Sequence, residues 1–271
     1  MTAQELLKQG KLDDCLKALE ADIRKDPAEP KRRIFFFQVL CVLGQWDRAL
    51  TQLGVIAEMD PKGSLMAQAC RAAITCEMIR ERVFAGETTP LVLGEPEQWV
   101  AWMIQAAALD AQGKGDAAAE LRGKAFDAAP ATTGFMEIGE PENPTRRDFE
   151  WIADSDERLG PMLEAFVDGK YYWIPYSRIG LVHIDKPEDL RDMVWAPANF
   201  VWASGGQGVG FIPARYPGTQ AASDLLRLSR GTEFADSGPL GQRVLATDAG
   251  EFDLLTIRNI RLNTIAAGAQ G

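Results

Sequence analysis

Two stretches near the start of the chain repeat each other at an interval of 34 residues, and this repeat constrains the fold strongly. The matching residues are Leu6 and Leu40, Gly10 and Gly44, Asp13 and Asp47, Leu16 and Leu50, Leu19 and Leu53, and Asp26-Pro27 and Asp60-Pro61. This period is typical of the tetratricopeptide repeat, a helix–turn–helix unit that buries its apolar face by stacking on a neighbour. Because such stacks form grooves for helices or peptides of other proteins, the first half of the chain indicates a binding protein.

Glycine and proline divide this first half into helices. Gly10 and Gly44 stand where a helix C-terminus commonly needs a left-handed residue. Pro27 and Pro61 end the second helix of each repeat. The predicted helical segments are 2–25, 28–60, 62–86, 98–112 and 114–129, with a loop over 86–97. The last two segments, joined at Gly113, are interpreted as a third, degenerate repeat.

The sequence pattern changes after residue 130. Residues 131–147 mix glycine, proline and charge without a period, which predicts a linker. Residues 148–262 are rich in aromatic side chains and alternate in polarity, which favours strands. We therefore expect an α+β fold, with a TPR-like helical repeat domain over 1–130 followed by a mainly antiparallel α+β domain over 148–262. Residues 263–271 are expected to form a frayed tail.

Several elements are predicted within the second domain. Asp154 and Glu157 match a capping box, and the apolar spacing from Leu159 to Phe166 predicts a helix after it. Strands are predicted over 170–176, 178–184, 199–216, 241–249 and 252–262, and short helices or turns over 187–193 and 224–230. The Gly-rich run over 205–210 is interpreted as a hairpin turn, because a strand-like segment follows it where a phosphate-binding loop would need a helix.

Charge and cysteine usage exclude several classes of function. The formal net charge of −10 disfavours nucleic acid and anionic membrane surfaces as partners. The start of the chain has no apolar signal-peptide region, and no apolar run reaches the length of a membrane span. The four cysteines, Cys15, Cys41, Cys70 and Cys76, include no CxxC pair. We interpret them as buried reduced thiols and expect a cytoplasmic location.

Candidate catalytic residues are few. His183 is the only histidine, so a zinc site has too few ligands, and a structural role is favoured over that of a general base. The GxSxG nucleophile motif is absent. The acids over 154–157 are interpreted as capping residues rather than as a cation site. We therefore predict no catalytic residues, no metal and no cofactor.

Aromatic residues are the strongest candidates for partner binding. Trp99 and Trp102 are three apart on a predicted helix and share a face. Tyr172 and Trp173 are neighbours on a predicted strand, so their side chains point to opposite faces. Phe36 lies among three consecutive phenylalanines that cannot all face one neighbour. These five residues, expected to be aromatic side chains that neither core needs, are the predicted partner-binding set, whereas core packing is favoured for most aromatic residues of the second half.

Long motifs connect the chain to a known family. They are IFFFQVLCVLGQWDRALTQL (34–53), AEMDP (57–61), VFAGETTPLVLGEPEQW (83–99), FEWIADSDERLGPMLEAFVDGKYYWIPYSRI (149–179), LRDMVWAP (190–197), IPARYPG (212–218) and GQRVLATDAGEFDLL (241–255). With these segments the chain resembles the ImpE/SciE/TagJ family over nearly its whole length. The resemblance implies a non-catalytic accessory protein of bacterial type VI secretion systems. It also implies binding to the N-terminal helix of the small contractile-sheath subunit, and an association, direct or through the sheath, with the ClpV-type AAA+ ATPase that disassembles spent sheath.

Three functions remain to be distinguished. The first is an adaptor that holds a helix of the sheath subunit. The second is a general chaperone-like module that binds many peptides through its repeats, from which the adaptor would differ by a strict preference for one helix. The third is an enzyme with a site around His183 and the acids over 154–157, which requires a concave pocket where titratable groups converge.

Overall fold

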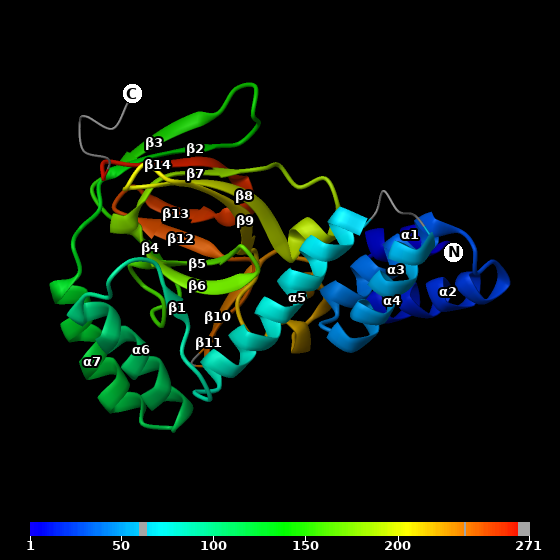
Figure 1. Cartoon of the computed structure of the whole chain (residues 1–271), viewed down its shortest axis with the longest axis horizontal. Helices are drawn as coiled ribbons and strands as arrows, with labels where there is room; N and C mark the ends of the chain where they lie inside the picture. Colours follow the sequence, from blue (N-terminus) through cyan, green and yellow to red (C-terminus); the bar gives the residue numbers. More distant parts are fainter. Residues whose placement is uncertain (60–63, 236, 265–271) are drawn as a thin grey trace.

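The computed structural model describes residues 1–59, 64–235 and 237–264, and Figure 1 shows their arrangement. The helices are α1 Ala3–Lys8, α2 Leu12–Lys25, α3 Pro30–Val42, α4 Trp46–Met59, α5 Ser64–Phe84, α6 Gln98–Ala111, α7 Gly115–Ala128 and α8 Asp224–Arg227. The strands are β1 Leu91–Val92, β2 Gly134–Ile138, β3 Thr145–Phe149, β4 Ile152–Asp154, β5 Met162–Val167, β6 Lys170–Pro175, β7 Ile179–Ile184, β8 Trp195–Trp202, β9 Gln207–Pro213, β10 Thr232–Ala235, β11 Gly238–Gly241, β12 Val244–Thr247, β13 Gly250–Asp253 and β14 Ile257–Leu262. Short 3-10 helices are η2 Tyr176–Arg178, η3 Leu190–Met193, η4 Thr219–Ala221 and η5 Leu254–Thr256. This architecture confirms the predicted α+β class.

The predicted repeat turns are present. Gly10, Gly44 and Gly113 all have a positive φ, of 72°, 66° and 72°. At Gly44 the amide donates to the carbonyl of Cys41, and the amide of Gln45 donates to that of Leu40. These two bonds define a Schellman motif, which ends a helix with a left-handed residue. The predicted turn at Asp60-Pro61 lies outside the described residues.

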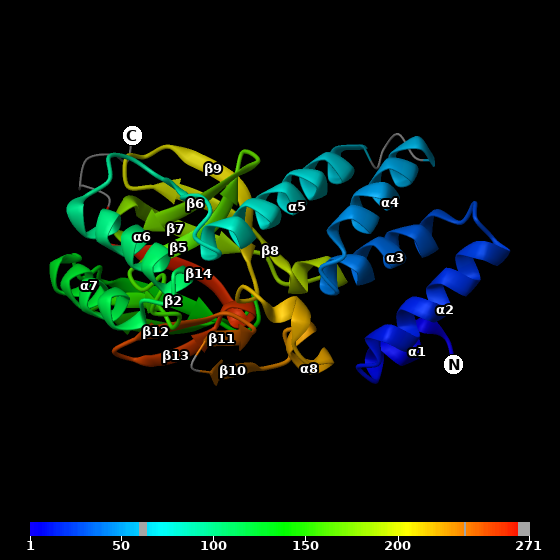
Figure 2. The same cartoon turned by 90° about the horizontal axis from the view of Figure 1, so that it is seen from below.

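The third helix pair does not continue the repeat stack. Figures 1 and 2 place the α6–α7 hairpin at one end of the molecule and α1–α4 at the other. The long helix α5 runs between them along the sheet. After α5 the chain contributes β1, which pairs in parallel with β6 at the sheet edge. The repeat domain is therefore interrupted by a short strand in the segment 86–97 that was expected to be a loop.

Fourteen strands form three sheets in the described part of the chain. The large sheet has nine strands in the order β1-β6-β5-β9-β8-β7-β14-β2-β3, and its pairs other than β1–β6 are antiparallel. A three-stranded sheet has the order β13-β12-β4, and β10 pairs with β11. The strands β8 and β9 form a hairpin whose turn includes Gly205 and Gly206, and the rest of the Gly-rich run lies in β9. The predicted hairpin is confirmed, although residues 207–210 are strand rather than turn.

Each face of the large sheet belongs to a different core. Tyr171 and Trp173 lie in the helix-side core, which the sheet shares with the helices. Tyr172 packs against the sandwich core between the large sheet and the three-stranded sheet, which includes Leu245 and Ile152. The alternation expected for this strand is confirmed. Because the helix-side core runs from α1 to residues of the sheet region, the two predicted domains pack on one another directly. Their exact division at 1–130 and 148–262 stays a prediction.

The structure corrects two predicted elements. The segment 159–166, predicted as a helix, contains β5, whose six residues are all buried. A strand covered on both faces has a continuous apolar run, which sequence periodicity does not separate from a buried helix. The prediction of a capping box at Asp154 is therefore wrong. The carboxylate of Asp154 instead accepts a hydrogen bond from the amide of Asp156 in a turn.

The predicted linker over 131–147 contains β2 and most of β3, which close the far edge of the large sheet. Only Phe149 of β3 is buried, so this strand has almost no apolar periodicity to reveal it. Exposed charges such as those of Arg146 and Asp148 are typical of an edge strand. The predicted tail over 263–271 lies outside the described residues from 265 onward.

Candidate partner-binding surface and the buried network behind it

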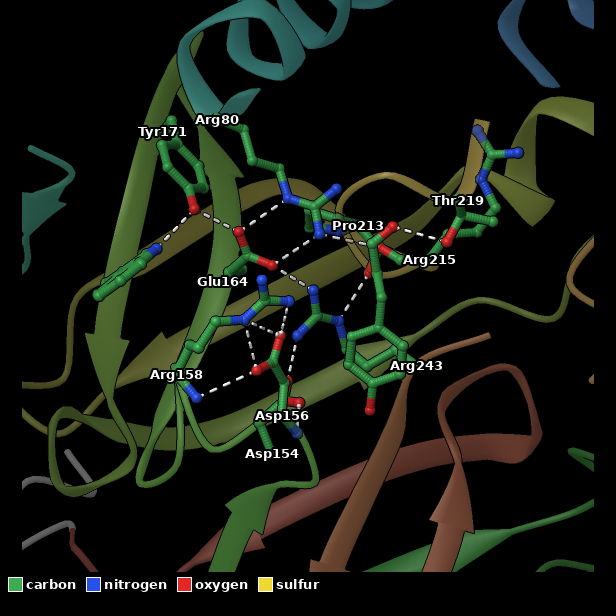
Figure 3. A network of polar contacts seen from close by, with 12 residues as sticks. Arg80, Asp154, Asp156, Arg158, Glu164, Tyr171, Pro213, Arg215, Thr219 and Arg243 are labelled. Atoms are coloured by element: carbon green, nitrogen blue, oxygen red, sulfur yellow. Dashed lines mark hydrogen bonds and ion pairs between the residues drawn. The ribbon is translucent and has the colours of Figure 1, made fainter. Parts of the chain in front are cut away.

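A buried carboxylate, that of Glu164, joins the helices to the sheet (Figure 3). Glu164 lies in the middle of β5 and has no exposed surface. Arg80 of α5 donates to both of its carboxylate oxygens, each over 2.8 Å. Arg243 and the hydroxyl of Tyr171 donate to the same carboxylate. Every side of this buried charge is thus satisfied, which is the condition under which a buried acid is tolerated.

Opposite effects set the pKa values of the two acids in this network. Burial would raise the pKa of Glu164, but the guanidinium groups of Arg80 and Arg243 outweigh it and lower the pKa to about 2. Burial raises the pKa of Asp154 to about 6, although Arg243 works against this shift. Glu164 is therefore the carboxylate that stays ionised at the centre of the network. As the pH falls, Asp154 is protonated before Glu164.

Further polar contacts fix the helical repeats against the sheet. Arg215, which follows β9, donates to the carbonyl oxygen of Val42 over 2.8 Å and so caps the end of α3. The indole of Trp195 donates to Glu77 of α5 over 2.9 Å. The same indole stacks on Trp46 with 6.0 Å between ring centroids. These contacts define the position of α3, α4 and α5 relative to the large sheet.

The segments that carry the family resemblance supply most of this network. The stretch 149–179 contributes Glu164, the stretch 212–218 contributes Arg215, and the stretch 241–255 contributes Arg243. Sequence reasoning did not find the network. The one signal in the sequence is a single acid inside the apolar run MLEAFV, whose spacing predicts a helix but which forms β5. A charge at such a position needs a buried partner, and the sequence does not say which arginine supplies it.

Several hollows lie on the surface of the described residues, among them two that lie between helices and strands. The larger, of about 580 Å³, lies between the α6–α7 hairpin and β10–β11. Four of its five charged side chains form ion pairs, Arg158 with Asp156 and Arg122 with Asp110, and the fifth is that of Glu157. The second, of about 390 Å³, is a mostly apolar groove between α5 and strands β5, β8 and β9, and we call it the α5 groove. The α5 groove is the surface best suited to an apolar face of another protein.

The five predicted partner-binding aromatics do not form one slot. Phe36, Trp99 and Trp173 are buried in the helix-side core, so the expectation that they are free of both cores is wrong. Trp102 is half-buried against the same core. Tyr172 is half-buried on the opposite face of the sheet. A role of Trp102 and Tyr172 in binding stays a prediction.

The other candidate residues have structural partners. His183 lies on β7 with its Nδ1 2.8 Å from the amide oxygen of Asn259 and its Nε2 3.4 Å from a carboxylate oxygen of Asp185. The cysteines Cys15, Cys41, Cys70 and Cys76 are free thiols and buried, as predicted. Burial raises the pKa of the Cys15 thiol to about 11. Within the part of the chain that the structure describes, no group of three or more His, Cys, Asp or Glu side chains could hold a metal ion.

No helix among the described residues has the length and hydropathy needed to cross a bilayer. A family model and a curated relative identify the family of this chain, and a solved structure shares its fold. The ImpE protein family model matches residues 146–261. The type VI secretion system accessory component TagJ of Pseudomonas aeruginosa is 48% identical over 262 residues, which cover 96% of this chain and 90% of that protein. The crystal structure of protein VPA1032 from Vibrio parahaemolyticus shares the fold, with a TM-score of 0.84, 22% identity and coverage of 96% of this chain and 97% of that chain. The chain therefore belongs to the ImpE family.

Proposed function

We propose that this protein is a non-catalytic, cytoplasmic accessory component of a type VI secretion system. In this role it binds the N-terminal helix of the small contractile-sheath subunit and links the sheath to its disassembly by a ClpV-type ATPase. The observation that carries the proposal is the 48% identity, over nearly the whole chain, to a protein named as a type VI secretion accessory component. The buried free thiols fit a reducing compartment such as the cytoplasm.

The surface of the protein supports a binding role. The α5 groove offers apolar side chains at its floor, and amphipathic helices bind in grooves of this kind. The net charge of −10 favours partners that carry lysine and arginine. These properties fit a helix-binding adaptor.

The alternative functions have less support. Among the acids over 154–157, Asp154 pairs with Arg243 and Asp156 pairs with Arg158. The hollow that Asp156 and Glu157 line does not include His183. A general peptide-binding repeat module would use a long continuous stack. Here the helices α1–α4 form two repeats before α5 turns onto the sheet (Figure 2).

The link to the ATPase is tested by co-sedimentation. Assembled sheath is mixed with this protein and with a ClpV-type ATPase, and pelleted. We expect this protein to pellet with intact sheath and to increase the ATPase in the pellet. Sheath assembled from a small subunit that lacks its N-terminal helix is the control, and it should retain neither effect. Equal pelleting with both sheaths would contradict the proposal.

A further inference from the structure

One face of the large sheet is covered by helices over only part of its width. On β5 and β6 this face packs in the helix-side core. Moving across the sheet, Phe166 of β5 pairs with Phe211 of β9, which also packs against that core. Two residues earlier on β9, Val209 projects from the same face and is 65% exposed. The partners in register with Val209 on this face are Asn199 of β8 and then His183 of β7, both exposed. At the level of Val209, the helical cover therefore ends between β5 and β8, whereas Trp195 at the start of β8 still packs in the helix-side core.

The uncovered strip lies next to small residues of α5. Ala69 and Ala72 of α5 line the α5 groove together with Pro197, Val209 and Phe211 of the sheet. The turn between β5 and β6 abuts the same helix, since a Cβ built on Gly169 would lie 3.6 Å from that of Ala72. One turn before Ala69, Leu65 is 78% exposed and shares its helix face. The groove thus has a sheet floor and one helical wall of short side chains.

The dimensions of secondary structure indicate what covers such a strip. Strands lie about 4.8 Å apart and a helix with its side chains is about 10 Å wide, so one helix covers about two strands. Packed helices lie about 8–10 Å apart, and the shorter distances need small side chains at the contact. The alanines of α5 meet that requirement. A second helix alongside α5 would cover β9 and β8 and would extend the layer that α5 and α6 begin.

The charge of the groove selects the kind of helix. Its charged lining residues are Asp168, at the turn between β5 and β6, and Asp185, which follows β7. Both side chains are exposed, and no lysine or arginine is among the described residues that line the groove. A helix with an apolar stripe flanked by lysine or arginine complements these carboxylates.

We propose, on the basis of the proposed function, that the amphipathic helix of the partner lies in the α5 groove alongside α5. Its apolar stripe contacts Val209, Phe211 and Pro197, and its basic side chains pair with Asp168 and Asp185. This surface differs from the aromatic set predicted from the sequence, which contains no residue of the α5 groove.

The proposal is tested with a fluorescently labelled peptide of the small sheath subunit's N-terminal helix, titrated with the full chain. Val209→Asp and Ala69→Glu place charge in the groove at exposed positions, and each should raise the Kd at least about tenfold. Val209→Thr keeps the branched shape, and Leu225→Asp adds a charge on α8, where Leu225 is 53% exposed outside the groove. Both control variants should bind within about twofold of the wild type. Circular dichroism melting of each variant shows that the fold is retained.

The role of the groove's two carboxylates in binding the helix is tested with the double variant Asp168→Asn/Asp185→Asn. Asparagine tolerates the left-handed backbone of Asp168, whose φ is 50°. The double variant should raise the Kd and reduce its dependence on salt. Trp102→Ala, from the aromatic set, should bind as the wild type does.

The outcomes distinguish an error in the proposed binding surface from an error in the proposed function. If the wild type binds the peptide and folded Val209→Asp and Ala69→Glu bind equally well, the α5 groove is not the site and the proposed function stands. If Trp102→Ala loses binding while the groove variants keep it, the site is the aromatic set. If the wild type binds neither the peptide nor the complete small subunit, the proposed function fails, and the groove assignment fails with it.

Discussion

Glu164 is an ionised acid in the centre of a strand whose residues are all buried, and this placement governs the chemistry around it. Two arginines from distant parts of the sequence, Arg80 and Arg243, converge on its carboxylate. Replacing one partner of such a pair leaves the others buried and uncompensated, which typically costs about 3–5 kcal/mol. The sequence indicated neither the charge pair nor its role, because ion pairing across the chain leaves no local pattern.

Glu164→Gln should therefore lower the free energy of unfolding by about 3 kcal/mol or more at neutral pH. The folded protein lowers the pKa of Glu164 from 4.5 to about 2. The stabilisation from Glu164 is thus complete above about pH 4.5 and is lost as the pH falls towards 2. Urea titrations of both proteins at several pH values should show a gap in stability that narrows over this range.

Glu233→Gln, at an exposed acid of β10, is the matched control and should change stability by less than about 0.5 kcal/mol. Asp154 acts in the opposite sense, because its raised pKa means that protonation below about pH 6 favours the folded state. Asp154 is present in both proteins, but the charge of Glu164 contributes to its raised pKa, so the comparison of Glu164→Gln with the wild type reports on Glu164 together with its effect on Asp154. A gap that stayed constant from neutral pH to pH 2 would contradict the ionised state assigned to this residue.

The contribution of Gly44 to stability is tested by comparing it with Gly113, another glycine with a positive φ. A Cβ at Gly44 would meet the side chain of Gln220 at 2.7 Å, whereas one at Gly113 would meet nothing within 4 Å. Both alanine variants carry the backbone cost of a left-handed L-residue, about 1–2 kcal/mol. Gly44→Ala should therefore be the more destabilising of the two, and Gly44→Val should cost at least as much. Equal denaturation midpoints for Gly44→Ala and the wild type would show that this turn is not left-handed in solution.

Among the helices, strands and turns, the sequence predicts correctly those that depend on residue types at neighbouring positions. Residue type and the alternation of polar and apolar side chains over a few positions predict the turn glycines, the strands β6 and β7, and the β8–β9 hairpin. The errors have a common physical cause. The element β5 is buried by layers on both faces, and β2 and β3 are held by pairing with β14 and with each other. Tertiary contacts decide these elements, and their local patterns are ambiguous or nearly absent.

The same reasoning applies to the partner-binding residues. Phe36, Trp99 and Trp173 were chosen because aromatic residues are frequent at interfaces, yet core packing uses the same residue types. The α5 groove is lined mainly by small residues such as alanine, glycine, proline and valine, and its two aromatic residues, Phe166 and Phe211, lie far apart in the sequence and form no local pattern. It exists because the helical cover of the sheet stops short, and that is a property of the assembled elements.

Arg215 connects two elements that are far apart in the sequence. It caps α3 by donating to the carbonyls of Cys41 and Val42 and also donates to that of Arg227. Arg215→Met keeps the length of the side chain but leaves buried carbonyls without a donor, so it should cost about 2–4 kcal/mol. Hydrogen exchange should accelerate more in α3 and α4 than in α6 and α7. The control is Arg48→Met, at an exposed ion pair, and equal effects of the two variants would contradict this role.

At the scale of the whole molecule, helices and sheet share one continuous core. The helix-side core includes residues from α1 through Leu228. A fragment of residues 1–130 would lose the sheet side of this core and should not reach a native fold. We expect the full chain to unfold in one transition that circular dichroism and tryptophan fluorescence report at the same denaturant concentration. Cooperative unfolding of the fragment with the helix content of the full chain would show instead that the repeats are independent.

The acidic balance of the molecule affects how fast a basic partner is captured. With a net charge of −10, association with a helix that carries lysine and arginine should be accelerated by long-range attraction. Raising the ionic strength screens this attraction, so the association rate should fall while dissociation changes little. Stopped-flow fluorescence measures both rates. An association rate that is the same at low and high salt would show that long-range attraction does not accelerate binding.

We propose that this ImpE-family protein holds one specific helix of the type VI sheath. Isothermal titration of the full-length chain with the N-terminal helix peptide of the small sheath subunit tests it directly. A peptide of the same composition in scrambled order is the control, because it keeps the charge and removes the apolar stripe. We expect saturable one-to-one binding of the native peptide and no binding of the scrambled one. Equal binding of both peptides, or failure to bind either the native peptide or the complete small subunit, would contradict it.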